Sequence, residues 1–221
     1  TVAPATLFVY DAAGRVILFR QLDRGIGQLD NAVRCLHHAH GARSKPNANS
    51  LGGEARASAG AAEASAFGRG TCATSDKDSA FGWYSTASGG SSIAGGYSSD
   101  ALCSNSTAWG FDNTAACIYA SAFGSLNSAS GYLSSAFGVQ NNVTNKGSAF
   151  GFLNSIGGYN STALGHCNCV TQADSSAIGI SNTNCACCVN TIGLYNSVSG
   201  AYSVCSNAIG TSNTIGGYNS T

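Results

Sequence analysis

The stretch Ser121–Tyr132, which reads SAFGSLNSASGY, contains a seven-residue repeat that ends in glycine, and two such repeats make a unit of fourteen residues. The first four residues of this unit recur along most of the chain, from Ser65–Gly68 to Asn207–Gly210. Self-similarity at a short fixed period is typical of solenoids, in which each repeat is too small to bury its own apolar face. The sequence therefore predicts a stack of coils, and we expect function to lie on a repeating surface.

Each seven-residue repeat offers only three or four strand-like residues between polar corners. The corners carry pairs such as Asn127-Ser128, which form turns and side-chain ladders, and the glycines permit a positive φ or a close approach between backbones. A helix is disfavoured because a glycine every seven residues costs about 1 kcal/mol each relative to alanine. Two short strands per unit predict an all-β fold, a flattened parallel β-roll solenoid over residues 47–221.

Neighbouring residues of a strand face opposite sides of a sheet, which separates the repeat into two sets of side chains. One set is small, mostly alanine, from Ala87 to Ala177. If it fills the thin roll, the other set forms an exposed stripe larger than the roughly few hundred Å² that a monomer exposes, which requires burial between chains. The alternative, with phenylalanine inside a monomeric roll, stays open. The stripe comprises Phe67, Phe81, Trp109, Phe123, Phe137, Phe150, Leu164, Ile178, Ile192 and Ile209.

Residues 1–46 do not repeat and form a separate N-terminal segment. Two apolar runs, Leu7–Tyr10 and Val16–Phe19, flank a turn sequence and predict a β-hairpin. Apolar residues at heptad-like spacing between Ile26 and Leu36 indicate a short oligomerising helix. A linker rich in polar residues then precedes the repeat domain.

Composition limits the classes of partner. Ten Lys and Arg balance ten Asp and Glu, and residues 1–50 hold six basic against three acidic residues. Neither part of the chain is basic enough to predict a nucleic-acid partner. No run approaches the ~18 apolar residues of a membrane helix, so we expect no membrane insertion by this segment.

Ten cysteines favour an oxidising compartment. Cys103 and Cys117 occupy the same repeat position, and so do Cys188 and Cys205. Equivalent positions on neighbouring coils lie about 4.8 Å apart, within the range of a disulfide, which predicts these two bridges. The alternative is that each is a small buried hydrophobe. A metal cluster of the nearby CxC and CxCC motifs is disfavoured, because zinc sites use paired CxxC or CxxxxC spacing.

Candidate chemistry is sparse, and we expect neither catalysis nor a cofactor. Three of the four histidines cluster before the repeats, where His38 and His40 form an HxH motif that resembles the axial metal sites of some trimeric fibres. Six tyrosines follow glycines near corners and predict a row suited to protein or glycan contact, or one that merely covers neighbouring coils. They are Tyr84, Tyr97, Tyr132, Tyr159, Tyr195 and Tyr218. Glycosylation acceptor motifs begin at Asn105, Asn142, Asn160 and Asn219.

The repeats Ser79–Gly89 and Ser121–Tyr132 resemble the head repeats of trimeric autotransporter adhesins of the Yersinia adhesin A type, the haemagglutinin-like head repeats. The resemblance extends over about 170 of the 221 residues. It implies a left-handed parallel β-roll, three chains side by side, and a role in surface attachment. Similar roll repeats occur in viral and phage fibres.

We therefore expect a non-enzymatic extracellular or cell-surface adhesin or fibre segment that self-associates and contacts a host surface protein, matrix or glycan. The alternatives are a self-assembling structural filament or a virion fibre subunit at the virion surface. Ice binding is a weaker alternative, because the position that would carry a threonine array varies among Thr, Ser, Asn and Cys.

Overall fold

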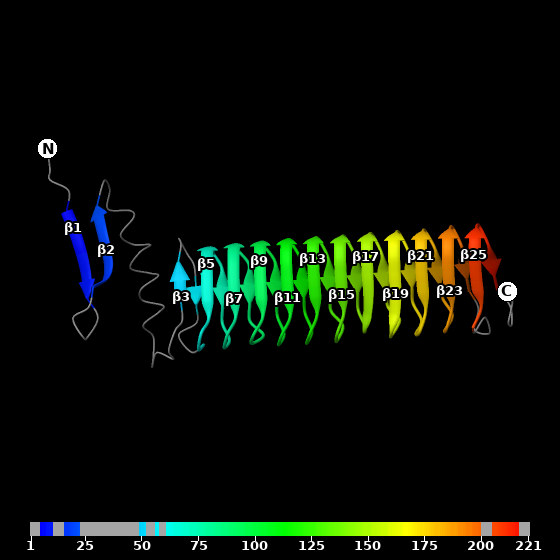
Figure 1. Cartoon of the computed structure of the whole chain (residues 1–221), viewed down its shortest axis with the longest axis horizontal. Coiled ribbons are helices and arrows are strands. Elements are labelled where there is room, and N and C mark those ends of the chain that lie inside the picture. Colours follow the sequence, from blue (N-terminus) through cyan, green and yellow to red (C-terminus); the bar gives the residue numbers. More distant parts are fainter. Residues whose placement is uncertain are drawn as a thin grey trace.

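The main body of the computed structural model is a parallel β-solenoid, a row of stacked coils that each contribute one long and one short strand (Figure 1). The structure describes residues 5–10, 16–22, 49–51, 56–57, 61–199 and 205–216, with side chains from residue 61 onward. These residues include no helix, and so none that could span a membrane. The predicted all-β solenoid is confirmed, with about fourteen residues in each coil.

Two parallel sheets of twelve strands each form the walls of the solenoid. The long-strand sheet consists of β3 (Asn49–Leu51), β5 (Ser65–Arg69), β7 (Ser79–Trp83), β9 (Ile93–Tyr97), β11 (Thr107–Phe111), β13 (Ser121–Ser125), β15 (Ser135–Val139), β17 (Gly147–Phe152), β19 (Ser161–His166), β21 (Ser176–Ile180), β23 (Asn190–Leu194) and β25 (Asn207–Thr211). The short-strand sheet consists of β4 (Arg56–Ala57), β6 (Cys72–Ala73), β8 (Thr86–Ala87), β10 (Asp100–Ala101), β12 (Thr114–Ala115), β14 (Ser128–Ala129), β16 (Asn142–Val143), β18 (Ser155–Ile156), β20 (Cys169–Val170), β22 (Thr183–Asn184), β24 (Ser197–Val198) and β26 (Thr214–Ile215).

The N-terminal strands β1 (Ala5–Tyr10) and β2 (Val16–Leu22) pair antiparallel. The predicted turn between them, the predicted short helix and most of the linker lie outside the described residues.

The small set of side chains fills the interior, and the large set lies outside. We number coil positions 1 to 14 from Ser121 to Ser134. Positions 2 and 9 face each other across the roll, and alanines such as Ala122 and Ala129 are fully buried there. The largest fully buried apolar side chains are Ile156, Val143, Val170, Val189 and Val198. The alternative with phenylalanine inside is therefore wrong, because alanines fill the interior positions and the phenylalanines are half-buried or exposed.

Position 7 carries stacked asparagines that bond to one another inside the roll. The amide nitrogen of Asn127 lies 3.0 Å from Asn113 Oδ1, 2.9 Å from the Phe123 carbonyl and 2.7 Å from the Gly138 carbonyl. Its backbone N–H also donates to Asn113 Oδ1 at 3.0 Å. Each asparagine thus ties its own corner to the coils before and after it. This asparagine ladder comprises Asn113, Asn127, Asn141, Asn154, Asn168, Asn182, Asn196 and Asn213.

Most corners bend through a residue with positive φ, and the shortened corner at Asn145 and Lys146 is an exception. In the reference coil these residues are Leu126 (φ 57°) and Leu133 (φ 56°), although bulky side chains seldom adopt this conformation. Their backbone N–H groups donate to the Phe111 and Ile118 carbonyls of the preceding coil, at 2.8 and 3.1 Å. Stacking therefore holds the strained corners in place.

Position 4 is glycine in every coil from Gly68 to Gly210. Gly124 has φ +118°, and a Cβ there would lie 2.0 Å from the Gly138 carbonyl oxygen. The close backbone approach expected from the sequence is confirmed at this position.

The coil of thirteen residues, Ser135–Gly147, keeps the strands in register, because Ser135 pairs with Ser148 and Asn142 with Ser155. The missing residue is removed at the corner around Asn145 and Lys146. The coil of seventeen residues begins at Asn190, which pairs with Asn207. Its extra residues fall near residues 200–204, which lie outside the described part of the chain.

We expect Asn141→Ala to lower the free energy of unfolding by about 3 kcal/mol, since it leaves buried groups of three coils without partners. Asn142→Ala changes the neighbouring exposed side chain and should alter the free energy of unfolding by less than about 0.5 kcal/mol. Urea unfolding followed by circular dichroism measures both. Equal effects would show that the ladder does not stabilise the stack.

Gly124→Ala should disrupt the stack at its coil, because the new Cβ meets backbone and the residue is held at positive φ. Gly157→Ala is the matched control: its Cβ would have no neighbour closer than 3.9 Å. Thermal unfolding should show a much lower melting temperature for Gly124→Ala and little change for Gly157→Ala. A tolerated Gly124→Ala would contradict the close approach.

Candidate functional site

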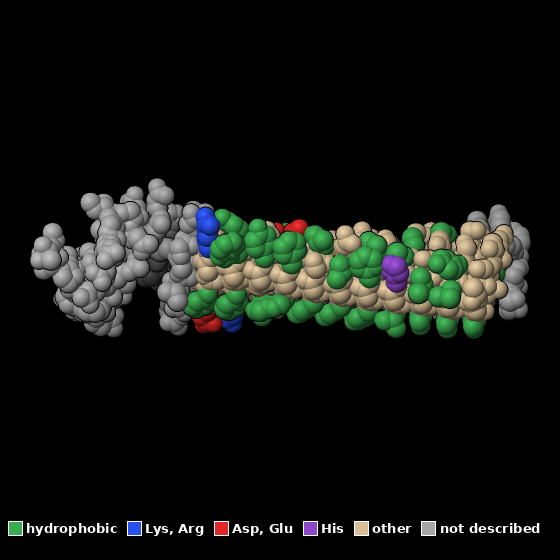
Figure 2. Space-filling model, turned by 90° about the horizontal axis from the view of Figure 1, so that it is seen from above, with side chains coloured by type: hydrophobic (Ala, Val, Ile, Leu, Met, Phe, Trp, Pro, Cys, Tyr) green, Lys and Arg blue, Asp and Glu red, His purple; other side chains and the backbone are tan. Residues whose placement is uncertain are grey.

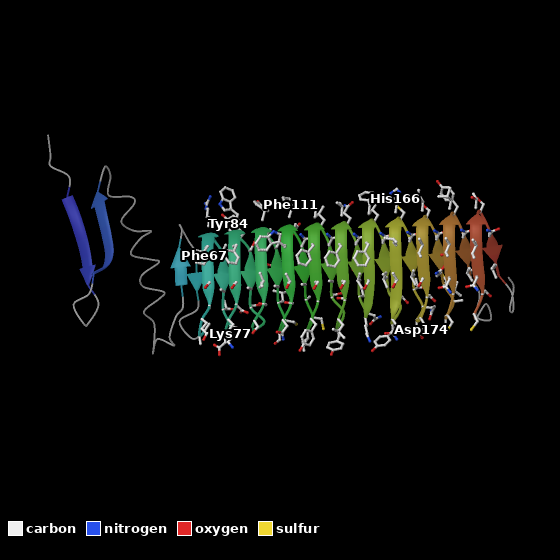
Figure 3. All side chains as sticks on the ribbon, in the orientation of Figure 1. Phe67, Lys77, Tyr84, Phe111, His166 and Asp174 are labelled. Atoms are coloured by element: carbon white, nitrogen blue, oxygen red, sulfur yellow. The ribbon has the colours of Figure 1, made fainter. Side chains whose placement is uncertain are left out.

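All ten predicted stripe residues lie on the outer face of the long-strand sheet, at position 3 of their coils. Figure 3 shows Phe67 on this face. Exposure reaches 46% for Trp109, 47% for Leu164 and 69% for Ile209. Four phenylalanines of the stripe are half-buried by their neighbours: Phe67, Phe81, Phe123 and Phe137. The predicted stripe thus lies on the outer surface, whereas its role as an oligomer interface stays a prediction.

The phenylalanine rings of the stripe stack on one another along the solenoid. The ring centroids of Phe123 and Phe137 are 5.0 Å apart with planes 3° apart, and those of Phe137 and Phe150 are 5.2 Å and 10° apart. Nearly parallel rings at this separation overlap face to face, so they present their edges to the outside. A partner must therefore fit between repeating ridges rather than lie on flat rings.

One coil lacks a large residue at position 3, and a neighbour fills the gap. Trp109 lies across Gly95, where a Cβ would be 2.3 Å from the indole ring. The indole thereby reaches Phe81 two coils away, at a centroid distance of 6.2 Å. The stripe is continuous because this glycine leaves room for the tryptophan.

A second hydrophobic row lies at position 5, the C-terminal residue of most of the same strands. It includes Trp83, Tyr97, Phe111, Val139, Phe152, Ile180 and Leu194, all exposed. This row was not predicted from the sequence, although the large residues that recur two places after the stripe residues indicate it. Figure 2 looks onto this edge, which His166 marks, and shows hydrophobic side chains along it and along one side of the roll.

The start of this second row is an aromatic cluster around a guanidinium group. The Arg69 guanidinium lies 5.7 Å from the Trp83 ring centroid and 5.8 Å from that of Tyr84. Tyr97 and Phe111 continue the cluster as stacked rings 5.2 Å apart. Trp, Tyr and Arg are the side chains enriched at binding hot spots.

The predicted single row of tyrosines is wrong, because the structure divides the tyrosines between opposite edges. Tyr84, Tyr97 and Tyr195 lie at the C-terminal ends of the long strands, whereas Tyr132 and Tyr159 lie at the opposite corner. Figure 3 shows Tyr84, Phe111 and His166 along one edge, with Lys77 and Asp174 along the other. The two seven-residue repeats of a coil end at opposite corners, so equivalent positions in successive repeats lie on opposite edges of the roll. Tyr218 lies outside the described residues.

The outer face of the short-strand sheet is mostly polar. Its positions 8 and 10 carry Ser and Thr in most coils, as in Thr86 and Ser88, with Cys, Asn, Asp, Gly, Ala and Leu102 in the others. The two broad faces of the roll therefore differ: one is hydrophobic along its centre and the other is hydroxyl-rich.

Nine cysteines within the described residues are free thiols. The predicted Cys103–Cys117 and Cys188–Cys205 disulfides are not formed in this structure. The Cys103 thiol instead donates to the Ala116 carbonyl at 3.0 Å. Among the described residues, no three His, Cys, Asp or Glu side chains gather closely enough to hold a metal ion.

The remaining predicted positions are partly described. Asn105, Asn142 and Asn160 are exposed, and Asn160 donates to Asp174 Oδ1 at 3.2 Å. Asn219, His38 and His40 lie outside the described residues.

No known family model matches the chain, and no curated protein is detectably similar to it in sequence.

The polar face contains one carboxyl group whose titration affects stability. Loss of hydration, opposed by hydrogen bonds from Thr86 and reinforced by the Asp112 carboxylate, raises the pKa of Asp100 above its ordinary value of 3.8. The folded state therefore favours the protonated form, and this contribution to stability is lost as the pH rises through the raised pKa.

We expect Asp100→Asn to raise the melting temperature relative to the parent protein at pH 7 and to leave it nearly unchanged at pH 3. Melting temperatures of both proteins between these pH values test this, with Asp174→Asn at the opposite edge as the control. A difference that does not depend on pH would contradict the expectation.

Proposed function

We propose that this chain is a non-enzymatic fibre or adhesin segment whose copies associate, as a homotrimer, along the hydrophobic stripe and expose the rest of their surface for attachment. The observation that carries the proposal is the stripe itself, a continuous row of exposed and half-buried hydrophobic side chains along one face of the solenoid. Monomeric proteins seldom leave such a large continuous patch in water.

The geometry of the stripe favours a second copy of the chain as its partner. Its ridges repeat once per coil, about every 4.8 Å. A partner that fits between them over many coils must have the same period. Another copy of the solenoid has this period because its backbone is identical. Symmetric association of identical chains is also the usual form of oligomer.

The number of chains and the role in attachment rest on the resemblance of the repeats to trimeric autotransporter heads. A long assembly with repeated edges offers many equivalent contacts, and multivalent binding strengthens weak individual interactions. The partner would be a host surface protein, matrix or glycan, and the location extracellular, at a cell surface or on a virion. The aromatic cluster at Trp83 supports binding at an edge that stays outside the interface.

Native mass by light scattering tests the assembly. We expect about 66 kDa, three times the 22.1 kDa of one chain. Large open-ended species would favour a structural filament instead. A monomer at micromolar concentration would overturn the proposed interface.

Matched triple variants locate the interface. Phe123→Ser, Phe137→Ser and Phe150→Ser together should convert the trimer into folded monomers, since these side chains lie outside the core. Phe111→Ser, Val139→Ser and Phe152→Ser change the second row and should leave the mass unchanged. If only the second set dissociates the protein, the interface lies on the other edge. Binding of the labelled trimer to arrays of matrix proteins and glycans then tests attachment.

A further inference from the structure

The hydrophobic core is interrupted near its C-terminal end. One buried cluster runs from Ala61 to Ala177, and a separate cluster begins with Ala186 and Val189. Between them, Asn184 and Thr191 occupy interior positions where other coils have apolar residues, and both are fully buried. The coils on either side therefore lose apolar contact at this point.

The polar groups at the interruption are only partly paired. Asn184 Nδ2 donates to the Ser176 carbonyl at 2.7 Å and to the Val189 carbonyl at 3.3 Å. Asn184 Oδ1, Thr191 Oγ1 and Ser206 Oγ are buried without a hydrogen-bond partner. Burial of unpaired polar atoms opposes folding, so stacking between these coils is weakened. The asparagine ladder continues across them, because Asn196 Nδ2 lies 3.1 Å from Asn182 Oδ1.

Two exposed thiols lie at the same corner position on either side of this weak stacking. Cys188 and Cys205 both have positive φ, 59° and 60°. Their backbone N–H groups make equivalent bonds to the preceding coil, to the Ala173 carbonyl at 3.1 Å and the Cys187 carbonyl at 3.2 Å. Equivalent positions on adjacent coils are about 4.8 Å apart, within the Cα range of a disulfide.

The thiols of two other cysteines face partners other than a cysteine. The Cys187 thiol faces Gln172 Oε1 of the preceding coil at 3.7 Å. In the other stacked pair, the Cys103 thiol bonds to a backbone carbonyl of the next coil. The pair at Cys188 and Cys205 is thus the one that combines exposure, matched register and a defect in the adjacent core.

We propose that Cys188 and Cys205 are a reversible oxidation site, at which a disulfide joins the two coils across the interruption in the core. One protein thiolate attacks a low-molecular-weight disulfide such as oxidised glutathione, forms a mixed disulfide and releases one thiol. The second protein thiolate then displaces the other thiol. Overall, two protein thiols are oxidised to a disulfide and the small disulfide is reduced to two thiols, with protons conserved.

The stacked geometry makes this link easily reduced. Side chains at equivalent positions of adjacent coils run parallel, so their Cβ atoms stay about 4.8 Å apart, beyond the usual ~3.5–4.5 Å of a disulfide. A strained and exposed disulfide is the labile kind. Loss of hydration, followed by the adjacent Cys205 thiol and then by Asp174 and Cys187, raises the pKa of Cys188. The thiolate fraction and the rate of oxidation therefore rise with pH.

The test uses the full chain, reduced and then incubated with mixtures of oxidised and reduced glutathione. Peptide mapping by mass spectrometry should find Cys188 joined to Cys205, with Cys103 and Cys117 still open to alkylation. In the reduced protein, amide exchange should be faster in residues 205–216 than in the coils around Phe123. Oxidation should slow amide exchange in residues 205–216 on the order of a hundredfold, as expected for closing a loop of this length.

Three variants complete the test. Cys205→Ser should abolish both the link and the slower exchange, whereas Cys103→Ser should change neither. Asn184→Val with Thr191→Ala should slow exchange in residues 205–216 without oxidation, because it restores an apolar core. A different partner for Cys188, no link at any glutathione ratio, or equal exchange in all reduced coils would overturn the proposal. None of these results depends on the stripe or on the number of chains.

Discussion

The asparagine ladder is the interaction on which the stack depends. A roll whose walls are two narrow sheets has an interior filled largely by alanine, which buries little apolar surface per residue. Each asparagine offsets this by bonding to its own corner and to both neighbouring coils, as Asn127 does. Buried amides that are fully paired also define the register, since a slipped coil would leave them without partners.

The same narrow interior determines the outer surface. Large side chains at position 3 cannot enter the roll, so they stack along the outside of the long-strand sheet and cover one another only partly. The tight backbone approach at Gly124 keeps adjacent coils close enough for their rings to overlap. An exposed surface with the period of the backbone thus follows from the packing of the core, and it is best matched by another surface of the same period.

Regular stacking also makes local defects easy to recognise. Asn184 and Thr191 break a pattern that holds in every other described coil from Ala66 to Ala177. In a solenoid, each coil contacts only its neighbours, so a weak interface is not compensated by distant contacts. A covalent link between Cys188 and Cys205 would act at that interface, and it would leave the broad faces of the solenoid unchanged.

The fourteen-residue period by itself determined the solenoid, the parallel pairing and the strictly alternating sets of side chains, because a fixed repeat leaves each residue type at one place in every coil. It left open which set faces inward. Only the tertiary structure decided this, since alanine side chains fill the interior and the phenylalanines lie on the outer face. The separation of Tyr84 from Tyr132, the second row at Trp83 and Phe111, and the unpaired atoms of Asn184 and Thr191 likewise depend on where each corner lies in space. Such relations across the roll cannot be read from neighbouring positions in the chain.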